Sequence, residues 1–415
     1  MKQNSRYLVI ADDFTGANDT GVQICRRGLP VSVVLSSDGV KTDDCSYVID
    51  TESRALSKTE TQEKLTRQLQ SVDFSSFHHV IKKVDSTLRG NIGVEIAATQ
   101  AVMNADLVLF APALPSLGRT TKNAVHMLNQ VPITQTEMAR DPKTPVREDN
   151  IQVILQKAFS QPVRHIGLQE IESGTIDFSG ATICTADATS NHHLELLVQA
   201  ALQTGRRILW CGTAAIADVL LGLERNIPPA LAVIASLSQV SNQQLLWAQK
   251  QGAALVSVPV NQLILGQVTP EEIAAQSLAF LKEGKDVLLA SAASVDRKTG
   301  LANADRAAQE KGMALEQVSF YTQDVIGTIA RLILEQFRPS GVFLTGGDTA
   351  IAFMRSLEAS GSMIQTEILV GIPMMRLRGG PWDGLKLITK AGAFGREDAI
   401  DYALRKLKEV DFSYE

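Results

Sequence analysis

The sequence predicts an α/β protein of two domains with largely parallel sheets and an active-site cleft between the domains. Short apolar runs alternate with helical patterns along most of the chain, which is typical of strand–helix units in a parallel sheet. Runs such as 107–111 show little internal alternation, as expected for strands covered on both faces. The 415 residues exceed a single ordinary core, since a domain holds about 150 residues.

The N-terminal domain is predicted to cover residues 1–228. Strands are expected at 7–11, 31–35, 47–50, 80–84, 107–111, 182–185 and 208–211. Helices are expected at 17–27, 58–69, 94–103 and 193–204. The first helix is expected to stop before Gly28 and Pro30. Residues 112–149 are irregular, and they form either an excursion around an active site or a partly ordered lid.

The C-terminal domain is predicted to cover residues 229–415, because Pro228 and Pro229 separate a finished helix from a new apolar run. Strands are expected at 231–235, 254–258, 286–290 and 341–345. Helices are expected at 242–251, 270–283, 324–337 and 396–409.

Composition and charge favour a soluble cytoplasmic protein. The net charge of −5 offers no global attraction to nucleic acid or to an anionic membrane. The four cysteines are scattered, without a C-x-x-C pair, which favours reduced thiols over disulfides or structural zinc. No signal peptide is expected, and no apolar run approaches the roughly 18 residues of a membrane span.

Acidic residues follow the first predicted strand, where parallel sheets bind ligands. Asp12, Asp13 and Asp19 lie within eight residues of one another. One interpretation is helix capping by Asp13 or Thr15. The other is that one carboxylate faces a ligand hydroxyl while its neighbour caps the helix.

Basic residues follow the third and fourth predicted strands. Arg54 could bind an anionic group in bidentate fashion, or be a solvated surface residue. Lys82 and Lys83 lie inside an apolar strand pattern and point to opposite faces, so one must pair with a carboxylate or reach solvent. With Asp85 nearby, this mixed charge suits a small substrate with a carboxylate and hydroxyls, or alternatively an internal salt-bridge network.

Three loops of the C-terminal domain suit a nucleotide site, since glycines and hydroxyls precede helices there. The residues are Ser236, Ser238, Gly346, Gly347, Asp348, Thr349 and Gly392. The Walker A motif, the G-x-G-x-x-G fingerprint, H-E-x-x-H and G-x-S-x-G are all absent from the sequence. The six histidines lack metal-ligand spacing.

Five motifs resemble those of the four-carbon acid sugar kinases, in the same order along the chain. They are segments 10–23, 82–93, 111–115, 346–349 and 390–395. The resemblance implies a sugar-acid-binding N-terminal domain and a nucleotide-binding C-terminal domain that transfer the ATP γ-phosphoryl group to a tetronate. It implies substrate contacts at Asp12, Arg54, Lys82, Lys83, Val84 and Asp85. It implies ATP contacts at the serine turn, at 346–349 and at Gly392. Ala235 replaces a glycine of that family's serine turn, so either serine could make the contact.

The resemblance favours phosphorylation of the C4 hydroxyl of D-threonate, with D-erythronate or a 3-oxo-tetronate as alternatives. Arg54 and one lysine would hold the substrate carboxylate, and Asp12 or Asp85 would be the base. Asp12 is favoured because its neighbour Asp13 should raise its proton affinity. Mg²⁺ is expected to bind together with ATP, but the sequence does not identify its ligands. A homodimer is one of the expected oligomeric states. Two other classes of protein remain as alternatives: a two-domain small-molecule-binding protein without catalysis, and a nicotinamide-dependent oxidoreductase.

Overall fold

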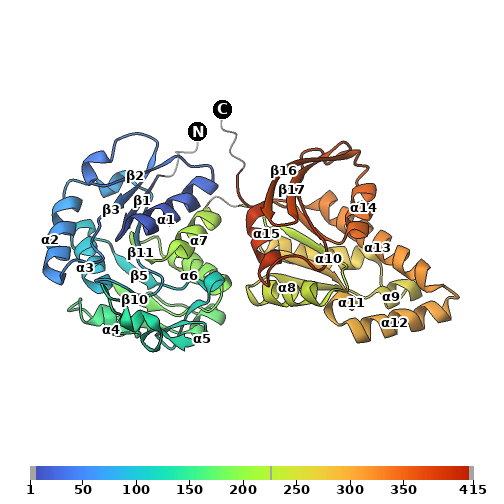
Figure 1. The fold of residues 1–415 in the computed structure, drawn as a ribbon, viewed down its shortest axis with the longest axis horizontal. Helices are drawn as coiled ribbons and strands as arrows, with labels where there is room; N and C mark the ends of the chain where they lie inside the picture. The colour runs from blue at the N-terminus through green and yellow to red at the C-terminus, as the bar shows by residue number, and fades with distance from the viewer. Residues whose placement is uncertain (1–5, 225–226, 411–415) are drawn as a thin grey trace. The chain divides into compact units, whose positions relative to one another are not determined.

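The computed structural model describes residues 6–224 and 227–410. The chain divides into two compact units, Met1–Asn226 with Val410–Glu415, and Ile227–Glu409 (Figure 1). The division falls between Asn226 and Ile227, two residues before the predicted boundary. The chain returns to the first unit at Val410, whose N–H donates to the Arg26 carbonyl.

The first unit is built on an eight-stranded sheet in the order β2-β3-β1-β4-β11-β5-β10-β9, parallel at each pairing. Its strands are β1 (Tyr7–Ala11), β2 (Val31–Val34), β3 (Ser46–Asp50), β4 (His79–Lys83), β5 (Leu107–Ala111), β9 (Arg164–Ile166), β10 (Ile183–Ala186) and β11 (Ile208–Gly212). Its helices are α1 (Phe14–Arg26), α2 (Lys58–Leu69), α3 (Ile92–Met103), α4 (Ile151–Gln156), α5 (Leu168–Glu172), α6 (Asn191–Gln203) and α7 (Ala214–Glu224).

Both faces of this sheet are buried, which explains the continuous apolar runs. Along β1, Val9 belongs to a core cluster with residues of α1, α6 and α7. Leu8 and Ile10 belong to a second cluster with residues of α2 and α3. Alternate side chains therefore enter opposite cores, and the predicted α/β class is confirmed.

The irregular stretch predicted at 112–149 contains a small antiparallel sheet. It consists of β6 (Arg119–Lys122), β7 (Val125–Leu128) and β8 (Val131–Pro132). Its strands are too short to show a clear alternation, so the sequence pattern did not predict them.

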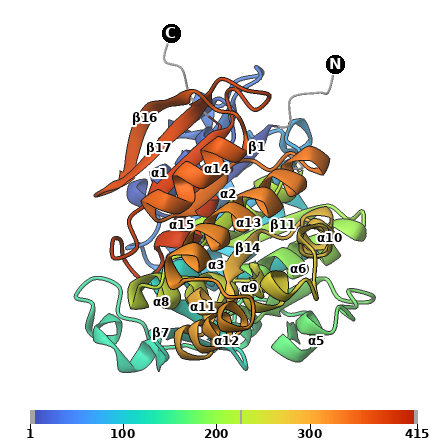
Figure 2. The same ribbon diagram turned by 90° about the vertical axis from the view of Figure 1, so that its right-hand side faces the viewer.

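The second unit holds a seven-stranded sheet in the order β13-β14-β12-β15-β18-β17-β16. Its strands are β12 (Leu231–Ile234), β13 (Ala254–Val258), β14 (Val287–Ser291), β15 (Val342–Thr345), β16 (Gly361–Leu369), β17 (Ile372–Arg378) and β18 (Lys386–Lys390). Its helices are α8 (Gln239–Lys250), α9 (Val260–Leu265), α10 (Pro270–Lys282), α11 (Ala292–Val295), α12 (Arg297–Glu310), α13 (Leu315–Gln336), α14 (Gly347–Ser356) and α15 (Ala399–Leu407). Figure 2 shows the β16–β17 hairpin at one margin of the sheet, and α13 beside α14.

The sheet of the second unit is only partly parallel. The β16–β17 and β17–β18 pairs are antiparallel, and these three strands were not predicted from the sequence. Residues 362–367 of β16 are all exposed, so neither face leaves an alternating apolar pattern. β18 begins and ends with lysine, which obscured its apolar centre. α13 begins at Leu315, nine residues before the predicted start.

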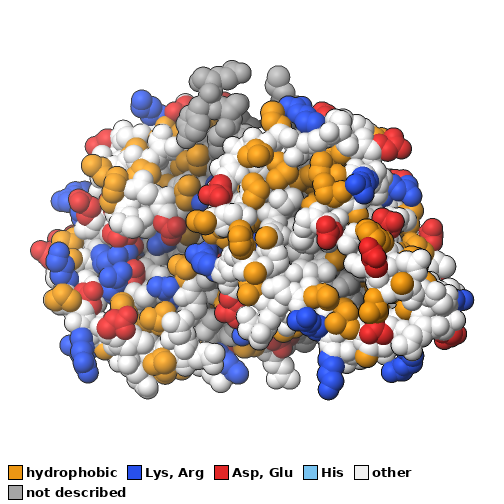
Figure 3. Space-filling view, turned by 45° about the vertical axis from the view of Figure 1, so that its right-hand side comes forward, with side chains coloured by type: hydrophobic (Ala, Val, Ile, Leu, Met, Phe, Trp, Pro, Cys, Tyr) orange, Lys and Arg blue, Asp and Glu red, His pale blue; other side chains and the backbone are white. Residues whose placement is uncertain are grey.

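The molecular surface in Figure 3 mixes basic and acidic side chains with hydrophobic ones over the face shown. Among the helices within residues 6–224 and 227–410, none is both long enough and apolar enough to span a bilayer.

Candidate functional site

The predicted substrate residues of the first unit gather at the carboxyl ends of three neighbouring strands. β3, β1 and β4 lie side by side and run parallel, and Figure 1 shows β3 beside β1. Asp12 follows β1, Arg54 lies in the turn after β3, and Asp85 follows β4. Because carboxyl ends of parallel strands meet at one edge of the sheet, these residues form a single cluster.

Arg54 is the centre of this cluster. Its Nε lies 2.6 Å from Asp12 Oδ2, and its Nη2 lies 3.1 Å from Asp12 Oδ1 and 2.7 Å from Asp13 Oδ1. Asp85 Oδ1 is 3.5 Å from the same nitrogen. Burial alone would lower the pKa of Arg54, but hydrogen bonds and charge from Asp12 outweigh it and raise the pKa. Arg54 is therefore a permanent cation whose bidentate face is bound to Asp12.

The two aspartates after β1 have different roles. Asp13 caps α1 by accepting the Gly16 N–H at 2.9 Å, so the capping interpretation is confirmed for Asp13. The buried Asp12 faces Arg54 instead. The guanidinium contacts both carboxylates and offsets the repulsion that the sequence analysis expected between them.

Asp85 is held as an anion by its own turn. Its Oδ2 accepts from the Thr87 N–H at 3.1 Å, the Arg89 Nε at 3.0 Å and the Thr87 hydroxyl. Its Oδ1 accepts from Arg89 Nη2 at 2.9 Å. Burial would raise the pKa of Asp85, but the Arg89 hydrogen bond and the Arg54 charge hold the pKa well below its usual value. Asp85 Oδ2 therefore has no lone pair left for another donor.

Lys82 and Lys83 are divided between the two faces of β4. The Lys82 ammonium lies 2.7 Å from Glu95 of α3 and also donates to the carbonyls of Lys83 and Ile10, at 2.8 and 3.3 Å. Lys82 thus pairs with a carboxylate, as one of the two lysines was predicted to do, and its three donors are satisfied.

The Lys83 ammonium, on the opposite face of β4, is less occupied by the protein than that of Lys82. Its ammonium donates to the Val84 carbonyl at 2.9 Å, and it forms no ion pair within residues 6–224 and 227–410. Burial lowers the pKa of Lys83, and nearby carboxylates, Asp12 first among them, oppose that effect. A Cβ added at Gly16 would lie 2.8 Å from this ammonium, so Lys83 lies against the start of α1.

Glu95, His126 and Asp141 belong to this region but were not predicted from the sequence. Glu95 is the partner of Lys82, and Ser53 Oγ donates to it at 2.9 Å. The buried His126 of β7 donates from Nε2 to the Ser86 carbonyl at 3.0 Å, and burial lowers its pKa to about 4. Asp141 lies 3.5 Å from Arg89. His126 and Asp141 come from the excursion, whose path no periodicity indicated.

The predicted nucleotide residues also gather at one sheet edge, in the second unit. β12, β15 and β18 are neighbours and run parallel. Their carboxyl ends lead into the Ser236 turn, the Gly346–Thr349 turn and the Gly392 loop. A Cβ added at Gly392 would lie 2.4 Å from Ser236 Oγ, and the Gly346 N–H donates to the Lys390 carbonyl at 2.8 Å.

The two glycines at the start of α14 have distinct roles. Gly346 has a φ of 90°, a backbone conformation that residues other than glycine rarely adopt. At Gly347, the first residue of the helix, a Cβ would meet nothing within 4 Å. The start of α14 therefore presents open space beside backbone N–H groups, which suits an anion such as phosphate.

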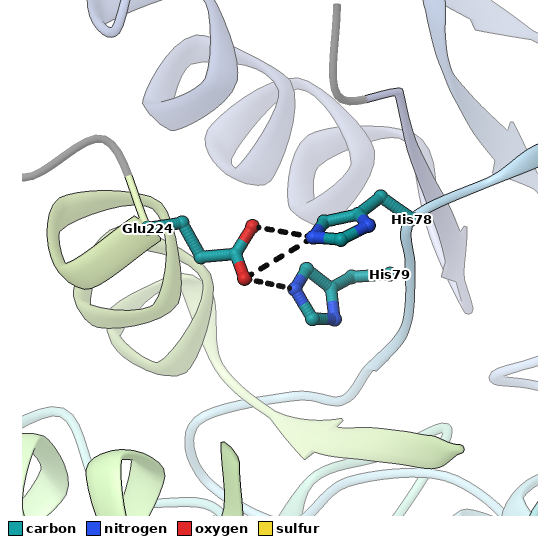
Figure 4. Close-up of side chains that lie close together, drawn as sticks. All are labelled: His78, His79 and Glu224. Carbon is teal, nitrogen blue, oxygen red and sulfur yellow. Dashed lines mark hydrogen bonds and ion pairs between the residues drawn. The ribbon is translucent and has the colours of Figure 1, made fainter. Parts of the chain in front are cut away.

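Two histidines and a glutamate form a cluster at the opposite edge of the first sheet, where β4 begins. His78, His79 and Glu224 offer ligand atoms within 4.8 Å of one another (Figure 4). They line a cavity of about 290 Å³ with Trp210 and Arg207. This association was not predicted from the sequence, because Glu224 is far from the two histidines along the chain.

The tautomer of His79 explains how this cluster is held. Trp210 Nε1 donates to His79 Nδ1 at 3.2 Å, so the proton of the neutral ring lies on Nε2. That nitrogen is 2.8 Å from Glu224 Oε1, and Tyr7 donates to the other carboxylate oxygen at 3.2 Å. In this tautomer His79 carries the hydrogen on the nitrogen nearest Glu224 and has no lone pair on that side for a metal ion.

Comparisons with known proteins cover nearly the whole chain. Residues 7–220 match a family described as a sugar-binding N-terminal domain, and residues 231–400 match one described as a nucleotide-binding C-terminal domain. A D-threonate kinase of Salmonella typhimurium is 32% identical over 98% of this chain and 99% of its own. A D-erythronate kinase of Heliobacterium modesticaldum is 27% identical, over 99% and 100%. A 3-oxo-tetronate kinase of Brucella melitensis is also 27% identical, over 94% and 93%.

A crystal structure from Bordetella bronchiseptica shares this fold, with a TM-score of 0.59 and 25% identity over 98% of this chain and 100% of its own. That protein is described as a domain of unknown function, with bound citrate, in a domain-swapped dimer.

Proposed function

The chain belongs to the four-carbon acid sugar kinase family, and we propose that this kinase phosphorylates the C4 hydroxyl of D-threonate with ATP. D-erythronate and 3-oxo-tetronates are the alternative acceptors, since kinases for both are among the relatives. The observation that carries the proposal is the cluster after β1, β3 and β4, where a buried carboxylate and a buried cation lie together. A sugar acid offers a hydroxyl for the first and a carboxylate for the second.

Lys83 is the cation assigned to the substrate carboxylate. Lys82 has all its donors engaged by Glu95 and two carbonyls, and Arg54 already holds Asp12 in bidentate fashion. The Lys83 ammonium has a single hydrogen bond within the described chain, to the Val84 carbonyl. A carboxylate that paired with it would also compensate a charge that burial disfavours.

Asp12 is assigned as the general base. Each of its carboxylate oxygens accepts one hydrogen bond from Arg54, which leaves a lone pair for a substrate hydroxyl. Asp12 would take the hydroxyl proton while that oxygen attacks the γ-phosphorus and the bond to the β–γ bridging oxygen breaks, releasing ADP. Asp85, saturated by Arg89 and Thr87, would orient the Arg54 guanidinium.

The second unit would hold ATP at the ends of β12, β15 and β18. The space above Gly347 and the tight Gly392–Ser236 approach suit phosphates bound by backbone N–H groups. Mg²⁺ bound to those phosphates would neutralise charge that develops during transfer.

The two lysines provide a matched pair of variants. Lys82→Met is expected to lower the free energy of unfolding by about 3–5 kcal/mol, because it leaves the buried Glu95 unpaired. Lys83→Met should leave stability unchanged and raise the sugar-acid KM about ten- to a hundredfold. Denaturant unfolding and steady-state kinetics measure both. If Lys82→Met folded normally and Lys83→Met kept its sugar-acid KM, the roles assigned to the two lysines would be wrong.

An ADP-release screen tests the function itself. The acceptors are D-threonate, D-erythronate, their 3-oxo forms, and the uncharged polyols threitol and erythritol. We expect the largest kcat/KM with D-threonate and little turnover of the polyols, which lack the carboxylate. If none of the sugar acids caused ADP to be released, the proposal would be contradicted. Thermal shifts with ATP and NAD would then distinguish a binding protein from an oxidoreductase.

A further inference from the structure

Lys390 is a buried lysine that connects the loops proposed to hold ATP. It is the last residue of β18, and its side chain is buried. Its ammonium donates to the Ala391 carbonyl at 3.1 Å, the Gly392 carbonyl at 3.0 Å and Ser241 Oγ at 3.2 Å. Ser241 Oγ in turn donates to the Gly392 carbonyl at 2.7 Å. Two successive carbonyls are therefore turned inward toward one cation.

The inward carbonyls determine where the N–H groups of this loop point. In a trans peptide the C=O and N–H point in opposite directions, and the described chain has no cis peptide. The N–H groups of Gly392 and Ala393 consequently point away from Lys390. Neither is hydrogen-bonded within residues 227–410, and Ala393 is exposed. Two adjacent N–H groups without a partner in the described chain are available to bind an anion.

The same lysine also contacts the Gly346–Thr349 turn, which is proposed to bind phosphate. Its backbone carbonyl accepts the Gly346 N–H at 2.8 Å, and Gly392 approaches Ser236 from across the sheet edge. We infer that Lys390 is a positioning residue for ATP, which turns the Gly392 and Ala393 N–H groups toward the phosphates. This inference rests on the proposed function, and it assigns Lys390 no contact with the nucleotide.

Lys390→Met tests the inference, because methionine keeps the length of the side chain and removes the charge. We expect the Kd for ATP, measured by calorimetry, to rise about tenfold and the sugar-acid KM to stay within about twofold. Lys386→Met is the matched control, since Lys386 is a second buried lysine at the other end of the same strand. It should leave the ATP Kd unchanged.

The pH dependence gives a second measurement. Burial lowers the pKa of Lys390 to about 8, so the ammonium predominates below that pH and is lost as the pH rises through it. ATP binding by the wild type should weaken between about pH 7 and about pH 9, whereas binding by Lys390→Met should not change.

The outcomes separate this inference from the proposed function. A wild type that phosphorylates no sugar acid contradicts the proposed function. An active wild type whose Lys390→Met variant binds ATP normally contradicts only the role of Lys390. A variant in which the ATP Kd, the sugar-acid KM and the melting temperature all change together also contradicts it, because such a loss indicates a general structural role.

Discussion

Asp12→Asn is expected to lower kcat by about 10²–10⁴, the usual contribution of a general base, while the KM for ATP stays near that of the wild type. The amide cannot accept the hydroxyl proton, although it is nearly the same size as the carboxylate. Arg54 would still contact Asp13 and Asp85, so the cluster should keep its shape. Single-turnover kinetics with saturating sugar acid measure the chemical step directly.

Asp13→Asn is the matched control. Asp13 also contacts Arg54, but it caps α1 and is partly exposed, and asparagine caps helices nearly as well as aspartate. We expect its kcat to change far less. If Asp12→Asn kept its kcat and raised only the sugar-acid KM, Asp12 would be a binding residue and its assignment as the general base would be wrong.

Gly347→Val is expected to weaken ATP binding about ten- to a hundredfold without unfolding the protein. A Cβ at this position would have no atom within 4 Å apart from its chain neighbours and the nearby backbone of α14, so the start of a larger side chain fits there. The valine would occupy the space where the proposed phosphate meets the start of α14. Calorimetry with ATP measures the loss, and the sugar-acid KM should remain unchanged.

Gly346→Val separates ligand contact from folding. Gly346 has a φ of 90°, which strains any β-branched residue, so this variant should lose thermal stability as well as ATP affinity. Gly347→Val should lose affinity alone. Normal ATP affinity in Gly347→Val would overturn the assignment of this turn.

Most strands that position the two sites were predictable because they are buried on both faces, and the exception is β18, whose terminal lysines obscured its apolar centre. The runs 7–11 and 107–111 carry apolar residues at every position, and parallel strands bring the polar residues that follow them to one edge. β16 was not predictable, because six consecutive residues on both of its faces are exposed. Without a buried face, a strand has no periodic signature.

The sequence predicted which residues belong to the site better than it predicted which of them contact one another. The sequence indicated that Lys82 or Lys83 needed a carboxylate, but it did not indicate Glu95, which reaches β4 from a helix. Arg54 was interpreted as a ligand for an anion, whereas Asp12 occupies its bidentate face. Which donor meets which acceptor depends on side-chain packing between elements, and a strand pattern does not contain that information.

Lys82 and Glu95 constrain how this sequence can diverge. Both side chains are almost completely buried and lie 2.7 Å apart, so replacing either one leaves a lone charge inside the protein. A lineage that lost one partner would pass through a poorly folding ancestor unless the second changed at nearly the same time. We therefore expect the two positions to covary among homologues, either kept as an ion pair or replaced together by apolar residues of similar volume.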